Sequence, residues 1–395
     1  MKRFLNCLIF LLVFFLVRQK TFAALGDAEI RGSFDGSDIV IKTTARLAGA
    51  IDSLTWKGKE FVDSTDHGRQ IQTAWNVNNY GQCYNPTEAG AANDGLKNQS
   101  STSLLLDFRI TGQSYITKSK PAFWLNPGVY DDNCEWDVSS SSPPWKSGYT
   151  INKTKVSNFI LEKNVKIGWQ NLDNVIEYVS NITIPQDQNL DVPIRSMILV
   201  HPAIYMPTDF SVFYRYDLRT ASLSQLMPAY GYSPIPAILA TPDGKYSLGL
   251  YTPDISWSGF PDNEQKAYTG YATLDWRSFG NTMLLSTRIP VKPEAKSTFD
   301  PGTYAYRSYL IIGTLANVQN SMIRLYRYFN SSGLADLNAD GKVDIFDYNI
   351  LVGNFGKTGA AGFTPADIDN NGKVDIFDYN ILVGNFGLPA GKAGK

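Results

Sequence analysis

The C-terminal part of this 395-residue chain contains the same sequence twice. GKVDIFDYNILVGNFG occupies residues 341–356 and again residues 372–387, so the two copies repeat with a period of 31 residues. A sequence that is repeated within one chain folds as one structural unit used twice. We therefore predict a tandem pair of equivalent units at this end of the chain.

Each copy belongs to an acidic loop with the pattern D-x-[DN]-x-[DN]-G-x-x-D-x-x-D. Oxygen atoms at positions 1, 3, 5, 7, 9 and 12 of such a loop bind Ca²⁺, and glycine at position 6 permits the sharp turn. A polar surface turn is the alternative, but it explains two matching loops at one period poorly. The sequence thus predicts two calcium ions. The predicted ligands are Asp336, Asn338, Asp340, Lys342 through its backbone carbonyl, Asp344 and Asp347 in the first loop, and Asp367, Asp369, Asn371, Lys373 through its backbone carbonyl, Asp375 and Asp378 in the second.

No helix is expected just before the first loop, where Ser331-Ser332-Gly333 forms a short linker, and a short helix is expected after each loop, over 348–355 and 379–386. A tandem loop–helix pair of this kind resembles a type I dockerin, the EF-hand-like module that docks enzymes onto cohesin domains. The resemblance covers residues 334–395 and implies a small α-helical fold that depends on its metal. It also implies a cohesin partner that contacts Ile345, Phe346, Asn349, Ile376, Phe377 and Asn380.

These docking positions depart from the pattern of many dockerins, which carry small hydroxyl residues where this chain has Ile-Phe. The identity of the partner is therefore open. Because the two copies agree at these positions, either half could dock. The alternative is that the Ile and Phe side chains pack in the core of the module itself.

The N-terminus has the features of a targeting segment. Lys2 and Arg3 precede an uncharged run over residues 4–17, and small residues follow at 21–24. This is typical of a secretory signal peptide, expected over residues 1–23, and the run is shorter than the ~20 residues that span a bilayer. We expect a secreted, extracellular or cell-surface-attached protein with no membrane span after cleavage.

Two features of the remaining chain limit its function. Lys and Arg total 36 against 37 Asp and Glu, so no concentrated positive charge is present to bind nucleic acid. After removal of the signal peptide, Cys83 and Cys134 are the only cysteines. In an oxidising compartment they could form one disulfide, and two separate buried thiols are the alternative.

Residues 24–330 have the pattern of a large β domain. Short runs rich in β-branched and aromatic residues predict strands, residues 235–251 predict a hairpin that turns at Pro242-Asp243-Gly244, and SSSSPPWKSG at 139–148 predicts a loop. Apolar residues at helical spacing predict one helix over 315–329, with Thr314 as its N-cap. The fold class is therefore mainly β, a large antiparallel sandwich with a C-terminal helix. The predicted strands are 39–41, 103–110, 175–184, 195–200, 210–216 and 304–312.

AGAIDSLTWKGKEFVDSTDHGRQIQTAW at residues 48–75 is similar to the start of galactose mutarotase-like domains. LVHPAIYMP at 199–207 and ATPDGKYSLGLY at 240–251 suit the same architecture. The resemblance covers residues 27–313 and implies a β-supersandwich with a sugar cleft. In such enzymes a histidine acid and a carboxylate base act across a sugar ring.

The chain has only two histidines outside the signal peptide, so each is a candidate for acid–base catalysis. By analogy with the mutarotase-like enzymes, the candidate catalytic residues are His67, Arg69, Glu88 and His201, and Arg69 would bind the carboxylate of a uronic acid. The alternative is that these residues have structural roles. The histidines would then be held by hydrogen bonds, and Arg69 and Glu88 would form an ion pair or anchor a turn.

Aromatic and amide side chains predict a second way of binding sugars. Exposed aromatic rings stack on the apolar faces of sugars, and amides bind the hydroxyl groups. The alternative is that most of these rings fill the core. The candidates are Trp75, Tyr80, Trp124, Trp136, Trp145 and Trp257, with Asn76, Asn78 and Asn79.

Together these features predict a secreted carbohydrate-active protein. The β domain would act in polysaccharide catabolism, as a glycoside hydrolase or polysaccharide lyase, and the calcium-binding tail would attach it to a cohesin. The alternative is a non-catalytic glycan-binding or structural protein displayed by the same tail. The sequence leaves open whether the chain is an enzyme.

Overall fold

A computed structural model describes most of the chain. The described residues are 25–136, 145–187, 193–218, 220–253, 267–275, 280–291, 298–330, 335–338, 340–359, 362–369 and 371–387. The predicted signal peptide, the predicted linker at 331–333 and Trp257 lie outside these ranges. Within them, no helix is both long and apolar enough to cross a membrane.

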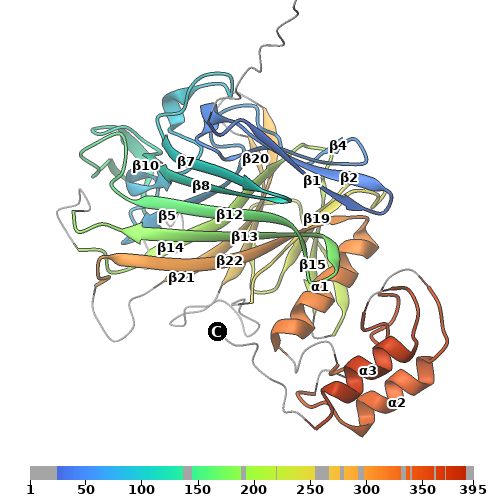
Figure 1. The fold of residues 1–395 in the computed structure, drawn as a ribbon. Coiled ribbons are helices and arrows are strands. Elements are labelled where there is room, and N and C mark those ends of the chain that lie inside the picture. Colours follow the sequence, from blue (N-terminus) through green and yellow to red (C-terminus); the bar gives the residue numbers. More distant parts are fainter. Residues whose placement is uncertain are drawn as a thin grey trace, which may run out of the picture.

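Two antiparallel β-sheets lie face to face in the large domain (Figure 1). The first has the order β1 (Ala28–Phe34), β2 (Ser37–Thr43), β3 (Ile51–Trp56), β5 (Ile71–Val77), β14 (Met197–Met206), β21 (Asn281–Val291), β20 (Tyr268–Asp275) and β17 (Gly231–Ser233), with the short strands β4 (Lys59–Glu60), β6 (Pro86–Thr87) and β9 (Ala122–Phe123) beside it. The second has the order β16 (Ser222–Leu226), β15 (Val212–Asp217), β18 (Ala237–Ala240), β19 (Ser247–Tyr251), β22 (Gly302–Gly313), β13 (Leu172–Ile184), β12 (Ile160–Trp169), β8 (Ser114–Lys120) and β7 (Leu104–Thr111). A separate antiparallel pair of strands consists of β10 (Tyr130–Trp136) and β11 (Trp145–Tyr149). The described residues also form three short 3₁₀ helices, η1 (Ala45–Leu47), η2 (Gly81–Tyr84) and η3 (Ala92–Asp94). The predicted class, mainly β with antiparallel sheets, is confirmed.

The hydrophobic core lies between the two sheets. Ile71 on β5 and Ile176 on β13 share one buried cluster, and Trp75 on β5 and Ile182 on β13 share another. Burial of each such side chain contributes roughly 1.5–3 kcal/mol. Because successive side chains of a strand point to opposite faces, the residues between them on β5, such as Gln72, face away from this core.

The predicted strands and the predicted hairpin are present, but one predicted loop is partly wrong. Each predicted run overlaps a strand, and β18 pairs with β19 across a turn in which Gly244 has φ +67°. Residues 145–148, the last four of the predicted loop, belong to β11, and residues 139–144 lie outside the described residues. Tyr149 of β11 lies opposite Tyr130 of β10 with their ring centroids 5.1 Å apart, and aromatic pairs across two strands stabilise a hairpin.

Helix α1 (Leu315–Asn330) follows β22 and packs on the outer face of the second sheet (Figure 1). Val318, Met322 and Leu325 are fully buried in one cluster with Tyr309 of β22. The Thr314 hydroxyl accepts a hydrogen bond from the Asn317 backbone N–H at 3.2 Å, which is the geometry of an N-cap. The predicted helix and its cap are therefore confirmed.

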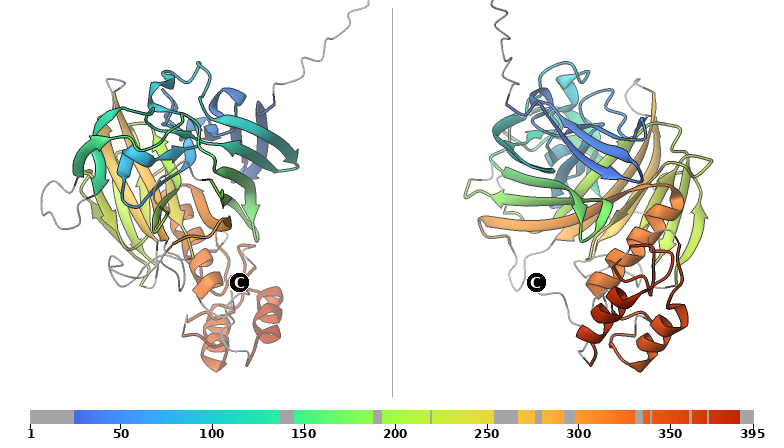
Figure 2. Two further views of the ribbon diagram at one scale, coloured as in Figure 1. Left: turned by 90° about the vertical axis from the view of Figure 1, so that its left-hand side faces the viewer. Right: turned by 45° about the vertical axis from the view of Figure 1, so that its right-hand side comes forward.

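The tail forms two short helices, α2 (Ile345–Asn354) and α3 (Ile376–Gly384), which lie beyond the end of α1 (Figure 2). Each begins three residues before its predicted start, because Asp344 and Asp375 act as N-caps and accept the backbone N–H of Phe346 and Phe377 at 2.8 and 2.9 Å. The tail has its own hydrophobic cluster, made by Ala335, Leu337, Val343, Leu351, Ala366, Ile368, Val374 and Leu382.

Candidate functional site

A cavity of about 350 Å³ opens on the face of the first sheet that is turned away from the second sheet. A bulge in β14 determines which side chains of that strand reach it. The register of β14 against β5 and β21 shifts between Val200 and Ala203, so that Val200, Ala203 and Tyr205 line the cavity. His201, before the shift is completed, faces the core between the sheets in alternation with Leu199.

The lining combines apolar surface with polar groups that suit sugar hydroxyls. Trp124 contributes a ring, and Leu274 and Leu284 contribute aliphatic surface. Amides both donate and accept hydrogen bonds, as sugar hydroxyls do. The amide and hydroxyl side chains of the lining are Gln72, Asn76, Gln82, Asn85, Thr87, Asn133, Tyr205 and Tyr230.

Arg288 on β21 is the one cation among the described residues that line the cavity. It is half-buried, and its guanidinium carbon lies 5.1 Å from the centre of the Tyr232 ring. Burial by itself would lower the pKa of Arg288. The effect of the neighbouring phenol groups is larger, so the pKa is raised overall; these groups belong to Tyr232, Tyr230, Tyr268 and Tyr205. The cavity therefore holds a permanent positive charge inside a group of tyrosines.

Two walls of the cavity are joined by a disulfide. Cys83 in η2 is bonded to Cys134 in β10, with their Cα atoms 4.6 Å apart. Gln82 and Asn133, the neighbours of these cysteines, both line the cavity. Of the two alternatives for the cysteines, the structure has the disulfide.

His67 and Arg69 are buried outside the cavity lining, and each is held by its own contacts. The two ring nitrogens of His67 lie 2.8 Å from the Ala89 carbonyl oxygen and 3.1 Å from that of Gln99. Arg69, 1% exposed, donates to Asp63 at 3.1 Å and to the Gly280 carbonyl oxygen at 3.1 Å. Both sets of contacts favour a structural role.

Glu88 and His201 belong to one polar network in the core between the sheets. Both side chains are fully buried, and Glu88 pairs with the ammonium group of Lys163. Thr73 links them: its backbone N–H donates to the Glu88 carboxylate at 2.9 Å, and its hydroxyl lies 3.4 Å from His201 Nδ1. Burial lowers the pKa of His201 to about 3. The structure thus brings together two of the four predicted catalytic residues, away from the cavity, and the catalytic role of the four stays a prediction.

The predicted stacking residues are distributed over several environments. Trp124 and Asn76 line the cavity, whereas Trp75 is fully buried in the core against Phe159. Asn78 donates to the Pro193 carbonyl at 3.0 Å in a separate groove, which Asn79 and Tyr80 also line. Trp136 and Trp145 form a cross-strand pair of the β10–β11 hairpin.

The described lining of the cavity contains no aspartate or glutamate. Glycoside hydrolases generally use two carboxyl groups on either side of the scissile bond. Among the described lining residues, no such pair of carboxyl groups is present.

The sequence analysis missed Arg288, Tyr205 and Tyr230. Tyr205 lies beyond a bulge that period-two counting does not detect, and Arg288 lies within a strand whose other residues are almost all apolar or hydroxylated. An arginine in such a strand was the one available signal, because a charged side chain there requires a cavity, a partner or a ligand.

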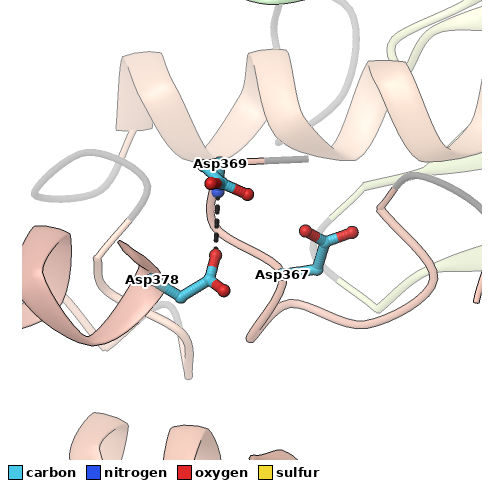
Figure 3. A group of neighbouring side chains, drawn as sticks. All are labelled: Asp367, Asp369 and Asp378. Atoms are coloured by element: carbon cyan, nitrogen blue, oxygen red, sulfur yellow. Dashed lines mark hydrogen bonds between the residues drawn. The ribbon is translucent and has the colours of Figure 1, made fainter. Parts of the chain in front are cut away.

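In the second acidic loop the carboxylates of Asp367, Asp369 and Asp378 offer oxygen atoms that all lie within 4.8 Å of one another (Figure 3). Burial, followed by the nearby carboxylates of Asp378, Asp367 and Asp375, raises the pKa of Asp369. Oδ1 of Asp367 is buried and has no hydrogen-bond partner among the described residues. A buried carboxylate oxygen without a donor fits a cation, so these residues suit the calcium ion that the loop pattern predicts.

The first loop has the same construction. Asp336 and Asp347 are fully buried, and Asp336 accepts the backbone N–H of Gly341 at 2.9 Å. Burial and the neighbouring carboxylates of Asp347 and Asp340 raise the pKa of Asp336. Gly341 has φ +94°, and Gly372 in the second loop has φ +84°, as the predicted turns require.

The residues predicted to meet a partner are exposed. Ile345 and Ile376 are each 52% exposed, and Phe346 and Phe377 are each 62% exposed. Asn349 and Asn380 are exposed as well. The alternative, in which the Ile-Phe pairs fill the core of the tail, is therefore wrong for this structure.

No model of a known protein family matches this sequence, and no curated protein sequence matches it. Among solved structures the chain is similar to an α-galactosidase from Lactobacillus brevis, with a TM-score of 0.38 and 10% identity over 78% of this chain and 42% of that one. It is similar to a heparan sulfate lyase from Pedobacter heparinus, with a TM-score of 0.37 and 7% identity over 73% of this chain and 35% of that one. A protein from Salmonella typhimurium assigned as a mutarotase matches with a TM-score of 0.30 and 11% identity over 74% of this chain and 97% of that one. The chain thus spans less than half of the first two proteins, and TM-scores below 0.5 establish neither a shared fold nor a shared function.

Proposed function

We propose that this chain is an extracellular sugar-binding protein, displayed on a cohesin-type partner by a calcium-loaded tail that resembles a type I dockerin. One observation carries the proposal: both copies of the repeat expose the same Ile-Phe pair beside a loop with buried carboxylates. Large exposed apolar side chains in matching positions are typical of a protein-binding surface.

Two calcium ions would be held by the twelve predicted ligands of the acidic loops. Bound there, Ca²⁺ would neutralise carboxylates that otherwise repel one another, and it would supply part of the folding free energy of the tail. The cluster made by eight small and aliphatic residues of the tail is small for a module of this length, which is why the tail needs its metal.

The partner surface would consist of the first turns of α2 and α3. In each copy the exposed Ile and Phe stand next to an exposed Asn one turn further along, Asn349 or Asn380. Because the pairs are identical, each half presents the same surface, and one partner domain would bind either half. A cohesin fits this surface better than a second copy of this chain, because self-association through two equivalent faces would give open chains of molecules.

The β domain would bind the glycan in the cavity beside Arg288. Its lining joins an indole ring and aliphatic side chains to eight amide or hydroxyl side chains, which is the composition of a site that orients a small polar ligand. We propose a galactose mutarotase-like supersandwich as its fold, with binding favoured over hydrolysis because the described lining lacks carboxylates. Lysis of a polysaccharide is the second candidate activity, since elimination does not need a carboxylate pair.

The docking proposal is tested with the full chain without its signal peptide. Calorimetric titration should show two Ca²⁺ bound per chain, and immobilised type I cohesins should capture the loaded protein but not the chelator-treated protein. Asp336→Ala together with Asp367→Ala should abolish both effects. Phe346→Ala together with Phe377→Ala should keep calcium binding and weaken capture about 30-fold or more, since buried aromatic anchors dominate such interfaces.

The single variant Phe346→Ala is the matched control. It leaves the second Ile-Phe pair intact, so its capture should fall by no more than about twofold, the loss of one of two equivalent sites. Capture that survives in chelator, or a panel of type I cohesins that binds none of the protein, would reject the dockerin assignment. Concentration-dependent self-association instead would identify a second copy of this chain as the partner.

A further inference from the structure

The position of Arg288 in the first sheet places it in the lining of the cavity. On β21 it lies opposite Val200 of β14 on one side and opposite Tyr268 of β20 on the other. Val200 lines the cavity with it, and Tyr232 stacks against its guanidinium group. The side chain therefore has a defined position rather than the freedom of a surface arginine.

Space for this side chain is provided by a glycine. A Cβ atom on Gly270, the residue of β20 that pairs with Ser286, would lie 3.0 Å from Arg288 Nε and 2.8 Å from the Ser286 hydroxyl oxygen. A Cβ atom there would require the Ser286 hydroxyl to move and the arginine to shift by a few tenths of an ångström. Gly270 thus fixes the path of the Arg288 side chain across the sheet.

Arg288 has no carboxylate partner among the described residues. None of the ion pairs of the described chain includes it, and its Nε is buried without a hydrogen-bond partner. By contrast, the buried Arg69 and Lys163 both have acidic partners within the protein. A guanidinium group that is withdrawn from water and left unpaired is destabilising unless a ligand supplies the anion.

The charge of the cavity limits which anion would fit. Since Arg288 is the one cation and no acidic residue is present in the described lining, a ligand with a single negative charge would leave the site neutral. The phenol groups of Tyr205 and Tyr230, which also line the cavity, can donate hydrogen bonds to an anion beside the guanidinium group. A doubly charged phosphate would leave one negative charge uncompensated in a half-buried site.

We propose that Arg288 binds a monoanionic group on a sugar ring, so that the glycan recognised by the cavity is acidic. This inference rests on the proposed sugar-binding role of the cavity and names the class of sugar. The anion is a carboxylate, as in a uronic acid, or a sulfate ester. The planar fork of arginine binds such groups through two parallel hydrogen bonds.

The experiment compares matched acidic and neutral ligands on the full chain without its signal peptide, in calcium. Oligogalacturonate and its fully methyl-esterified form share one sugar backbone and differ in the charge and the methyl group of each carboxyl, and an oligosaccharide of sulfated dextran provides the sulfate ester. The wild-type protein should bind one of the two acidic probes about 10- to 100-fold more tightly than the neutral ester, the range expected for charged hydrogen bonds. Added salt should reduce this preference.

Arg288→Gln should remove the preference for the acidic probe and leave the affinity for the neutral ester unchanged. Gly270→Ala, which keeps the charge but displaces the arginine, should reduce the preference partly. Arg109→Gln is the matched control, because Arg109 is an exposed arginine on β7 of the other sheet, paired with Asp107. It should behave like the wild type.

The outcomes separate this inference from the function on which it rests. Equal wild-type affinity for acidic and neutral probes, or a preference that persists in Arg288→Gln, would overturn the acidic-sugar inference while the sugar-binding role stands. Binding of none of the probes would overturn both. A preference for sulfated dextran alone that depends on Arg288 would identify the anion as a sulfate ester, and one for oligogalacturonate alone would identify a carboxylate.

Discussion

Replacement of Lys163 by methionine should destabilise the β domain severely. Lys163 on β12 and Glu88 are both fully buried and form an ion pair between the sheets. The ammonium group also donates to the Gly49 carbonyl at 3.0 Å. Lys163→Met removes the positive charge, keeps most of the side-chain volume, and leaves Glu88 as an unpaired carboxylate in the core.

The size of the effect follows from what remains around Glu88. The carboxylate keeps the Thr73 backbone N–H at 2.9 Å and the Tyr178 hydroxyl at 3.3 Å, but it loses its cation. Removal of one partner from a buried ion pair costs about 3–5 kcal/mol. With Glu88→Gln added, no charge is left in the core, so the double variant should recover at least about 2 kcal/mol of that loss.

Urea unfolding followed by tryptophan fluorescence measures this directly. All eight tryptophans lie between residues 56 and 276, so the signal reports on the β domain and not on the tail. With a denaturant slope of about 3 kcal/mol per molar, suited to a domain of this size, the midpoint should fall by roughly 1–1.7 M. Lys166→Met, at an exposed position of the same strand, is the control and should change the unfolding free energy by less than about 0.5 kcal/mol.

One result would refute the reasoning. Suppose that the free energy of unfolding of Lys163→Met were within about 1 kcal/mol of the wild-type value, and that the double variant were no more stable than the single one. The ion pair of Lys163 and Glu88 would then not anchor the two sheets to each other. Loss of sugar turnover without loss of stability in Glu88→Gln would then favour the catalytic role that the sequence predicts for Glu88.

Two further predictions concern acid and reduction. Because burial lowers the pKa of His201 from 6.5 to about 3, only the unfolded state binds a proton between these values, so the β domain should lose stability as the pH falls, by about 2 kcal/mol at pH 5. Urea unfolding of His201→Gln should show a flatter pH profile, and an equal slope would contradict this origin of the acid sensitivity. Replacement of both Cys83 and Cys134 by serine should lower the unfolding free energy by about 2–4 kcal/mol and weaken binding of the acidic probe, because Gln82 and Asn133 would no longer be held together. Unchanged affinity in this variant would show that the hairpin does not shape the cavity.

The features that the sequence predicted well depend on neighbours along the chain. The strands of the sandwich follow from β-branched and aromatic runs, and α1 follows from the apolar spacing of residues such as Val318 and Met322. The acidic loops were predicted by a spacing of oxygen ligands, which is itself local, and the glycine conformations at Gly341 and Gly372 agree with it. The exposure of the Ile-Phe pairs, by contrast, could not be predicted from the pattern, because it depends on how the two halves of the tail pack against each other.

The proposed sugar site could not be predicted because it depends on strand order and on one bulge. Arg288 and Gln72 are more than two hundred residues apart, and both line the cavity because β14 lies between β5 and β21. The bulge after Val200 then brings Tyr205 to the cavity, whereas His201 faces the core as the alternation from Leu199 requires. The sequence drew attention to the histidines, and the strand order places Arg288 and Tyr205 in the cavity lining.

The tail and the cavity lie on different sides of the sandwich, and α1 is the reason. Its apolar face packs on the outer face of the second sheet, and the Arg324 guanidinium donates to the Ile368 carbonyl of the tail at 3.2 Å. The cavity opens on the outer face of the first sheet. A partner held by the tail would therefore approach from the side of the second sheet and leave the cavity open. For a sugar-binding domain displayed on a scaffold this arrangement matters, because a long glycan can reach Arg288 only if docking does not cover the first sheet.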